Sequence, residues 1–337
     1  MKTYKLKKIF SAVFISLALL ACQVSGLLVT PTPIPPTATF TVTPSSTATP
    51  TVTPSPTLTP TPLPVIKRVL ILSIDGLRPD AIQLAPMPNL LALMQTSAYT
   101  LSAQTIFPSS TLPSHASMLT GLCPTRHGVT WNDYIPENGY ARGFDLFDLA
   151  HAAGLKTVMY VGKEKLRQVT EPGSTDIFVY INDRDLVIIE QLLANFPVDF
   201  RLMFIHFPTP DGMGHEYGWL SPEQLSVLFR ADEALNNLLV ALDSYGLRKE
   251  TLLIITADHG GHDTTHGTSL PEDMTIPWII SGPGIQPMQL TSPVQTMDTA
   301  ATAAYALGLT IPEEWDGVPV TEAFGLPFEA NDYVVCP

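Results

Sequence analysis

The stretch that decides the fold is Arg68-Val-Leu-Ile-Leu-Ser-Ile-Asp-Gly76. Its first seven residues are nearly all apolar, which is typical of a strand that is buried on both faces of a parallel sheet. The pattern recurs twice later in the chain, at Arg201-Leu-Met-Phe-Ile-His206 and at Thr251-Leu-Leu-Ile-Ile-Thr256. Helix-like segments separate these strands, so we predict an α/β fold with a mostly parallel central sheet and helices on both faces.

Three segments between and after the strands have helical patterns. Ser221-Pro-Glu-Gln224 combines a capping box with proline at the first helical position, which predicts a helix running toward Asp243. Asp298 to Leu307 is rich in Ala and predicts a late helix packed on the sheet. A shorter helix is expected from Ser114 to Thr120.

The N-terminal residues have the pattern of an export signal. Several lysines precede an apolar run that is short for a membrane span and that ends at Leu19-Leu-Ala-Cys22. This ending resembles a bacterial lipobox, in which the cysteine is lipidated; a plain cleaved signal is the alternative. We predict a lipoprotein signal peptide over residues 1–22 and an exported protein that is anchored to the cell envelope by a lipid on Cys22.

Two further regions follow the signal. Residues 23–64 are dominated by Thr, Pro and Ser, with no charged residue from Thr30 to Pro64, so we predict a disordered stalk that buries no core. Residues 65–337 are long enough for one domain with a substantial core, held outside the cytoplasm.

The charge composition indicates which kinds of molecule the chain can bind. The chain has 18 Lys and Arg against 31 Asp and Glu, a formal net charge of −13, and the predicted loss of the signal lysines makes it still more acidic. We therefore expect no nucleic-acid surface, which requires clustered basic residues. Of the three cysteines, Cys123 and Cys336 are left after Cys22; they can pair in an oxidising compartment, but their spacing does not decide it.

Acidic and imidazole side chains follow the three predicted strands. Because the carboxyl ends of parallel strands meet at one edge of a sheet, we expect these side chains to converge there. Carboxylate and imidazole together suit zinc better than calcium or magnesium, and six ligands are enough for two ions. The candidate ligands are Asp75, Asp211, His215, Asp258, His259 and one of His262 and His266.

A candidate nucleophile lies in Phe107-Pro-Ser-Ser-Thr-Leu-Pro-Ser-His115, a cluster of hydroxyls before the predicted short helix. A hydroxyl at a helix N-terminus beside zinc loses its proton more easily, and the helix N–H groups can hold a phosphate oxygen. A helix cap followed by a turn is the alternative interpretation.

Together these motifs resemble the alkaline phosphatase superfamily, and within it the type I phosphodiesterase and nucleotide pyrophosphatase family. The resemblance implies an alkaline phosphatase-like fold and two Zn²⁺ ions, with Thr111 as the nucleophile. It also implies that Asn132 helps to hold a phosphate oxygen. One zinc is expected among Asp75, Thr111, Asp258 and His259, and the other among Asp211, His215 and His266. The motifs are Asp75-Gly, Thr111 in the hydroxyl cluster, Thr120-Gly, His127-Gly, Asp211-x-x-x-His215, Asp258-His-Gly and His266-Gly.

The sequence departs from the family in two places. The residue after the nucleophile is Leu112, where these enzymes typically have an aromatic residue that stacks on a nucleotide base. The last ligand also follows Asp258 closely, which leaves His262 and His266 as competing candidates, and the resemblance favours His266. Lys163 can approach a substrate phosphate, but we predict an exposed lysine there.

These features predict a two-zinc hydrolase of small-molecule phosphate esters, either phosphodiesters or nucleotide pyrophosphates, that works through a phosphothreonine intermediate. A phosphomonoesterase or phosphonate hydrolase of the same superfamily is the enzymatic alternative. A non-catalytic binding lipoprotein is an alternative of another class. A sulfatase is disfavoured because Thr111-Leu-Pro-Ser-His115 lacks the Cys/Ser-x-Pro-x-Arg motif.

Overall fold

The computed structural model describes residues 66–328, 334 and 336. The predicted signal peptide with Cys22 and the predicted stalk lie outside the described residues. Within the part of the chain that the structure describes, no helix combines the length and apolarity needed to cross a membrane.

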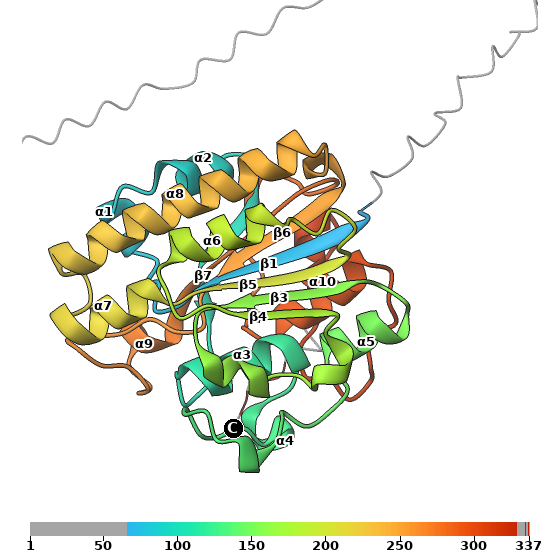
Figure 1. Ribbon diagram of the computed structural model, residues 1–337, viewed down its shortest axis with the longest axis horizontal. Helices are drawn as coiled ribbons and strands as arrows, with labels where there is room; N and C mark the ends of the chain where they lie inside the picture. The colour runs from blue at the N-terminus through green and yellow to red at the C-terminus, as the bar shows by residue number, and fades with distance from the viewer. Residues whose placement is uncertain (1–65, 329–333, 335, 337) are drawn as a thin grey trace, which may run out of the picture. The chain divides into compact units, whose positions relative to one another are not determined.

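The described residues are organised around one eight-stranded sheet with the strand order β4-β3-β5-β1-β6-β7-β2-β8 (Figure 1). The five strands from β4 to β6 are mutually parallel, β7 is antiparallel to both of its neighbours, and β8 is parallel to β2. The strands are β1 (Arg68–Ile74), β2 (Ala98–Gln104), β3 (Thr157–Val161), β4 (Ile177–Tyr180), β5 (Leu202–Phe207), β6 (Thr251–Thr256), β7 (Thr275–Ser281) and β8 (Met288–Gln289).

Helices cover both faces of the sheet, which confirms the predicted fold class. Figure 1 shows α8 with α1, α2 and α6 on one side of the sheet and α3, α5 and α10 on the other. The α-helices are α1 (Ala81–Leu84), α2 (Pro88–Met94), α3 (Thr111–Thr120), α4 (Pro124–His127), α5 (Leu146–Ala152), α6 (Asp185–Ala194), α7 (Thr209–Tyr217), α8 (Pro222–Ser244), α9 (Pro271–Met274) and α10 (Asp298–Ala306). Short 3₁₀ turns are η1 (Pro136–Asn138), η2 (Glu164–Gln168), η3 (Pro172–Ser174), η4 (Arg248–Glu250) and η5 (Thr321–Phe324).

The strand register sets where the functional edge lies. β1 is central, and Ser73 near its end pairs with His206 of β5 on one side and with Thr256 of β6 on the other. All residues of β1, β5 and β6 are buried, as expected of strands covered by helices on both faces. The three strands therefore end at the same level, and the loops that follow them emerge side by side.

The predicted helices are present with shifted boundaries. α8 begins directly after Ser221, whose hydroxyl accepts a hydrogen bond from the Gln224 N–H at 3.2 Å, as a capping residue should. α3 begins at Thr111, three residues before the predicted start at Ser114. Pro113 does not prevent this, because an N–H in the first turn of a helix has no intrahelical partner to lose.

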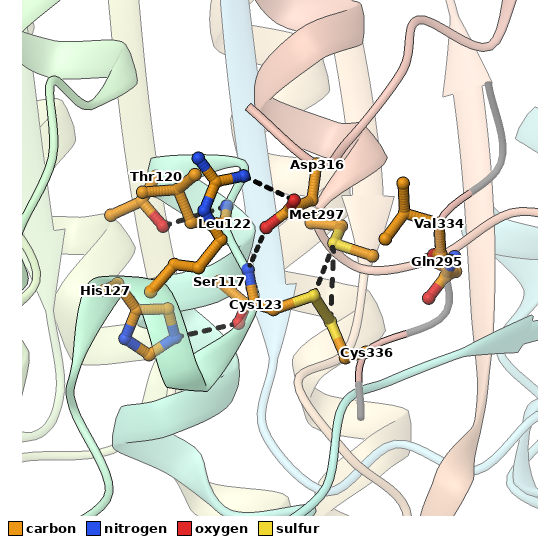
Figure 2. The surroundings of a disulfide bond; sticks show 11 residues. Ser117, Thr120, Leu122, Cys123, His127, Gln295, Met297, Asp316, Val334 and Cys336 are labelled. Carbon is orange, nitrogen blue, oxygen red and sulfur yellow. Dashed lines mark hydrogen bonds and ion pairs between the residues drawn. A yellow bond between two sulfur atoms is a disulfide. The ribbon is translucent and has the colours of Figure 1, made fainter. Parts of the chain in front are cut away.

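A disulfide between Cys123 and Cys336 ties the C-terminal end of the chain to the segment that follows α3 (Figure 2). The two Cα atoms are 5.4 Å apart. The Cys123 N–H donates to the Asp316 carboxylate at 2.8 Å, and the Met297 Sδ lies 3.7 Å from the Cys336 Sγ. The structure thus pairs the two cysteines that the sequence left undecided.

Replacing Cys336 by serine is expected to lower the stability of the folded domain by about 2–4 kcal/mol, because the unfolded chain is no longer cross-linked over a long loop. Thermal unfolding of the oxidised protein and the variant measures the difference. A reducing agent should lower the melting temperature of the wild type to that of Cys336→Ser and leave the variant unchanged. Equal melting temperatures for the oxidised wild type and the variant would contradict this expectation.

Candidate active site

The carboxyl edge of the central strands gathers all the residues predicted to form the site. Asp75 directly follows β1, and Asp258 and His259 follow β6 after one residue. Asp211 and His215 lie in α7, which begins two residues after β5, and their spacing of four places them on one face of that helix. His266 comes from the loop between β6 and α9.

The first group of candidate ligands consists of Asp211, His215 and His266. The Asp211 Oδ1 lies 3.5 Å from the Nε2 of each histidine. The two imidazole rings are tilted at 51° to each other, with their centroids 4.9 Å apart. These three ligand atoms lie within 4.8 Å of one another, which is compact enough for a single ion.

The second group surrounds His259. Its Nε2 lies 3.3 Å from the Asp75 Oδ1, 3.2 Å from the Asp258 Oδ2 and 3.4 Å from the Thr111 Oγ1. The Asp211 Oδ1 is 4.0 Å away, and the ligand atoms of Asp75, Asp211 and His259 lie within 4.8 Å of one another, so the two groups share Asp211. This arrangement brings the predicted nucleophile into contact with the predicted ligands.

The hydrogen bonds of the three candidate-ligand histidines determine which ring nitrogen of each carries the proton. Each Nδ1 lies against a backbone carbonyl oxygen, at 2.8 Å for His259, 3.0 Å for His215 and 2.9 Å for His266. Because a carbonyl can only accept, each Nδ1 carries the proton and each Nε2 presents a lone pair. The lone pairs therefore point at carboxylate oxygens, acceptor against acceptor.

The carboxylates complete the test for metal ions. The Asp75 Oδ1, the Asp211 Oδ1 and the Asp258 Oδ2 are buried and have no hydrogen-bond partner among the described residues. Buried acceptors without a donor are costly, and here they face imidazole lone pairs. Divalent cations between these atoms would satisfy both sets, so the residues fit a metal-binding centre.

Burial and neighbouring charges shift the pKa values of the carboxylates and imidazoles at this centre. Burial alone would raise the pKa of Asp75, but the Lys163 ammonium and His206 outweigh it and hold the pKa well below its usual range. Burial and the negative charge of Asp75 raise the pKa of Asp258. Burial lowers the pKa of His259, and burial together with His259 lowers the pKa of His266 to about 4. Both shifts favour the neutral imidazole of His259 and of His266, which is the form that binds metal.

Two buried histidines that sequence reasoning missed hold the ligands in place. The His206 Nδ1 accepts the Gly162 N–H at 3.3 Å, so its Nε2–H donates to the Asp75 Oδ2 at 2.8 Å. The His115 Nδ1 donates to the Thr111 carbonyl at 2.7 Å, and its Nε2 contacts the Ser73 hydroxyl at 2.8 Å. Outer partners of this kind fix the orientation of the groups that bind metal and substrate.

Gly76 shapes the turn after β1. Its φ of 73° is in the left-handed region that favours glycine. Its N–H donates to the Asp258 Oδ1 at 3.2 Å, which leaves the other oxygen of Asp258 facing His259. The turn therefore connects the ends of β1 and β6 and orients a candidate ligand.

The N-terminus of α3 presents Thr111 and Asn132 together. The Asn132 Oδ1 accepts from the Leu112 N–H at 2.9 Å and from the Lys165 Nζ at 3.2 Å. With its oxygen engaged, the amide NH₂ of Asn132 is left to donate to another group. Leu112 is fully buried and offers no surface on which a base could stack.

The prediction of an exposed lysine at position 163 is wrong. The Lys163 side chain is 19% exposed, and its Nζ lies 2.7 Å from the Asp75 Oδ2 and 2.5 Å from the Asp211 Oδ2. Two buried carboxylates compensate the cost of burying the ammonium, which exposure statistics for lysine do not anticipate. They raise the pKa of Lys163 against the opposing effect of burial.

His262 and His266 occupy different surroundings. The His262 Nδ1 contacts the Asp273 Oδ1 at 2.7 Å, and this pairing raises the pKa of His262. It belongs to neither group of candidate ligands, whereas His266 does. The geometry therefore favours His266, as the sequence did.

A groove of about 410 Å³ opens beside the centre. Lys163 and Gly162 line it on the β3 side, and Arg184, Met213 and Glu216 line it farther along. Lys163 connects this groove with the centre, because it contacts Asp75, Asp211 and Thr111, which are themselves buried.

Comparison with known proteins finds a matching family and related proteins. The family model described as "Type I phosphodiesterase / nucleotide pyrophosphatase" matches residues 69–170 and 170–275. The human ectonucleotide pyrophosphatase/phosphodiesterase family member 5 is 26% identical over 219 residues, covering 58% of this chain and 45% of the relative. The matched region thus spans less than half the length of that relative.

Solved structures share the fold. The murine member 5 superposes with a TM-score of 0.64 at 17% identity, covering 74% of this chain and 97% of that one. A threonine-to-alanine variant of the same murine protein, described as inactive, has been solved in complex with AMP. A phosphonate monoester hydrolase from Silicibacter pomeroyi superposes with a TM-score of 0.63 at 17% identity, covering 78% of each chain.

Proposed function

The chain belongs to the type I phosphodiesterase / nucleotide pyrophosphatase family, and from this premise we propose that it is a two-zinc hydrolase of phosphodiesters or nucleotide pyrophosphates. The observation that carries the proposal is the meeting of Thr111 with unpartnered carboxylate oxygens and imidazole lone pairs at one edge of the sheet. Such a centre needs cations, and cations beside a hydroxyl favour phosphoryl transfer.

We assign Asp211, His215 and His266 to one ion, and Asp75, Asp258 and His259 with Thr111 to the other. When bound, the two ions supply positive charge that lowers the pKa of the Thr111 hydroxyl and of a water molecule and stabilises charge on the leaving oxygen.

The protein residues position the reacting groups. Thr111 gives up its proton to solvent, and its oxygen bonds to phosphorus as the bond from phosphorus to the leaving oxygen breaks. The leaving oxygen takes a proton from solvent. Water then hydrolyses the phosphothreonine, which restores the Thr111 hydroxyl and releases the phosphorylated product. The Asn132 amide NH₂ and the Thr111 N–H hold non-bridging oxygens during both steps, since the Leu112 N–H already donates to the Asn132 Oδ1.

Removal of the metal is expected to abolish hydrolysis. Dialysis against a chelator should reduce turnover of bis-p-nitrophenyl phosphate by at least about 10³-fold, because the hydroxyl and the leaving oxygen then lose their electrostatic stabilisation. Added Zn²⁺ should restore turnover as elemental analysis reports its return. Full activity after complete removal of metal would overturn the two-zinc proposal.

A second candidate function is hydrolysis of phosphate or phosphonate monoesters. Burial of Leu112 favours it, since no side chain at that position is available to stack on a nucleotide base. Parallel assays with bis-p-nitrophenyl phosphate and p-nitrophenyl phosphate separate the two, and we expect the diester to react faster. Faster turnover of the monoester would favour the second candidate, and binding without turnover of either would favour the non-catalytic lipoprotein.

We also propose that the domain works outside the cytoplasm, anchored by a lipid on Cys22. The Cys123–Cys336 disulfide supports this, because such bonds persist mainly in oxidising compartments.

A further inference from the structure

Lys163 lies at the nucleophile as well as at the carboxylates. It follows β3 after one residue, and its Nζ lies 3.2 Å from the Thr111 Oγ1. We propose that Lys163 is a further catalytic residue, whose ammonium donates a hydrogen bond to the Thr111 oxygen and stabilises the negative charge on that oxygen as it attacks phosphorus. The inference rests on the proposed hydrolysis through Thr111 and adds a residue that the sequence analysis predicted to be exposed.

The carboxylates leave room for Lys163 and for cations at the same time. Asp75 and Asp211 each present Oδ2 to the ammonium. Each presents its other oxygen, Oδ1, toward the histidine Nε2 atoms, and that oxygen has no hydrogen-bond partner among the described residues. Lys163 therefore pairs with different carboxylate oxygens from those that face the imidazoles.

The backbone at Lys163 is fixed by its surroundings. The Gly162 N–H donates to His206, and His206 in turn donates to Asp75. A Cβ at Gly162 would lie 2.2 Å from a ring carbon of Pro208. Only glycine therefore allows the end of β3 to approach the start of α7, the helix that carries Asp211, this closely. The donor is thus held in place before substrate arrives, which is the property that makes electrostatic stabilisation effective.

The ammonium has carboxylate partners as well as the hydroxyl. Its Nζ lies 2.7 Å from the Asp75 Oδ2 and 2.5 Å from the Asp211 Oδ2, so two buried partners hold the positive charge in place. At the Thr111 oxygen Lys163 contributes that charge and a hydrogen bond.

The test compares Lys163→Met with Lys156→Met. Lys156 provides a matched control, because it directly precedes β3 and also pairs with a carboxylate. Its Nζ lies 2.8 Å from the Asp199 Oδ1, and Asp199 is not one of the candidate ligands. We expect Lys163→Met to lower kcat for bis-p-nitrophenyl phosphate by about 10²-fold, the cost of removing one preorganised donor, with KM changed less than about threefold. Lys156→Met should retain full turnover. Zinc per chain, by elemental analysis, should be the same in all three proteins.

A second arm asks whether Lys163 acts through the Thr111 oxygen. In a Thr111→Ala background, Lys163→Met should cause less than about a threefold further loss, because the atom it serves is already gone. An equal further loss in that background, or full turnover of Lys163→Met at normal zinc content, overturns the inference. So does a loss that additional zinc repairs, since Lys163 would then serve only metal binding.

Two further variants separate a failure to fold, and a failure of the proposed function, from a failure of this inference. If Lys163→Met does not fold, Lys163→Gln replaces it, because an amide still donates to Asp75 and Asp211 while lacking the charge. The proposed function is tested separately by Thr111→Ala, so an active Lys163→Met enzyme would refute the role of Lys163 and leave the nucleophile assignment intact.

Discussion

Thr111→Ala is expected to lower kcat for phosphate-ester hydrolysis by at least about 10³-fold and to abolish the covalent phosphoenzyme. The Thr111 oxygen is the group that lies against both His259 and Lys163, so no neighbouring hydroxyl can take its place. Acid quenching during turnover, followed by mass spectrometry of the α3 peptide, should show phosphothreonine in the wild type only. Zinc content should change little, since Asp75, Asp258 and His259 remain as ligands of the ion beside Thr111. The melting temperature should change little as well, since alanine is a good residue for the first turn of a helix.

Ser110→Ala is the matched control for Thr111→Ala. Ser110 precedes Thr111 and is the N-cap residue of α3, yet its side chain makes no capping hydrogen bond. Removing this hydroxyl should leave kcat within about threefold of the wild type, because it has no role in the proposed chemistry. If Thr111→Ala retained turnover, or if phosphate appeared on another residue, the assignment of the nucleophile would be wrong.

Asp211→Asn is expected to produce the second large loss. Its Oδ1 is the carboxylate atom shared by His215 and His266, and the amide keeps the shape of the side chain while removing its charge. We expect zinc to fall from about two to about one ion per chain and kcat to fall by at least about 10²-fold, because the ion assigned to Asp211, His215 and His266 then lacks its only carboxylate.

The control for Asp211→Asn is Asp199→Asn, which removes a carboxylate from an exposed pair with Lys156. A surface pair of this kind contributes little, so zinc content and kcat should be unchanged. Elemental analysis of both variants, alongside turnover, measures the effect. An Asp211→Asn protein that holds as much zinc as the wild type would contradict the proposed division of ligands between the two ions.

The parts of the fold that could be predicted are those with local signals. The apolar runs of β1, β5 and β6 predicted buried parallel strands, and the Ser221 cap predicted the start of α8. The antiparallel β7 was not predicted, because strand direction depends on partners far away in the sequence. The predicted start of α3 was three residues late, because the expected helix excluded Pro113, whereas a first helical turn accepts proline.

The candidate site was predictable where residues follow strand ends or match a motif. Asp75, Asp211 and Asp258 could be found this way because parallel strands deliver their ends to one edge. Lys163 follows β3 in the same manner, but a lysine in a loop is usually exposed, and only the tertiary structure places two carboxylates beside it. His206 carried a weaker signal, a single polar side chain within an otherwise apolar strand.

The central claim is that two cations are held around Thr111. Diffraction data collected at the zinc absorption edge from crystals grown with Zn²⁺ test it most directly. The account predicts two anomalous peaks, one bounded by Asp211, His215 and His266, and the other bounded by Asp75, Asp258 and His259 beside the Thr111 oxygen. A map without a peak between these side chains, or with zinc bound only elsewhere on the domain, would contradict it.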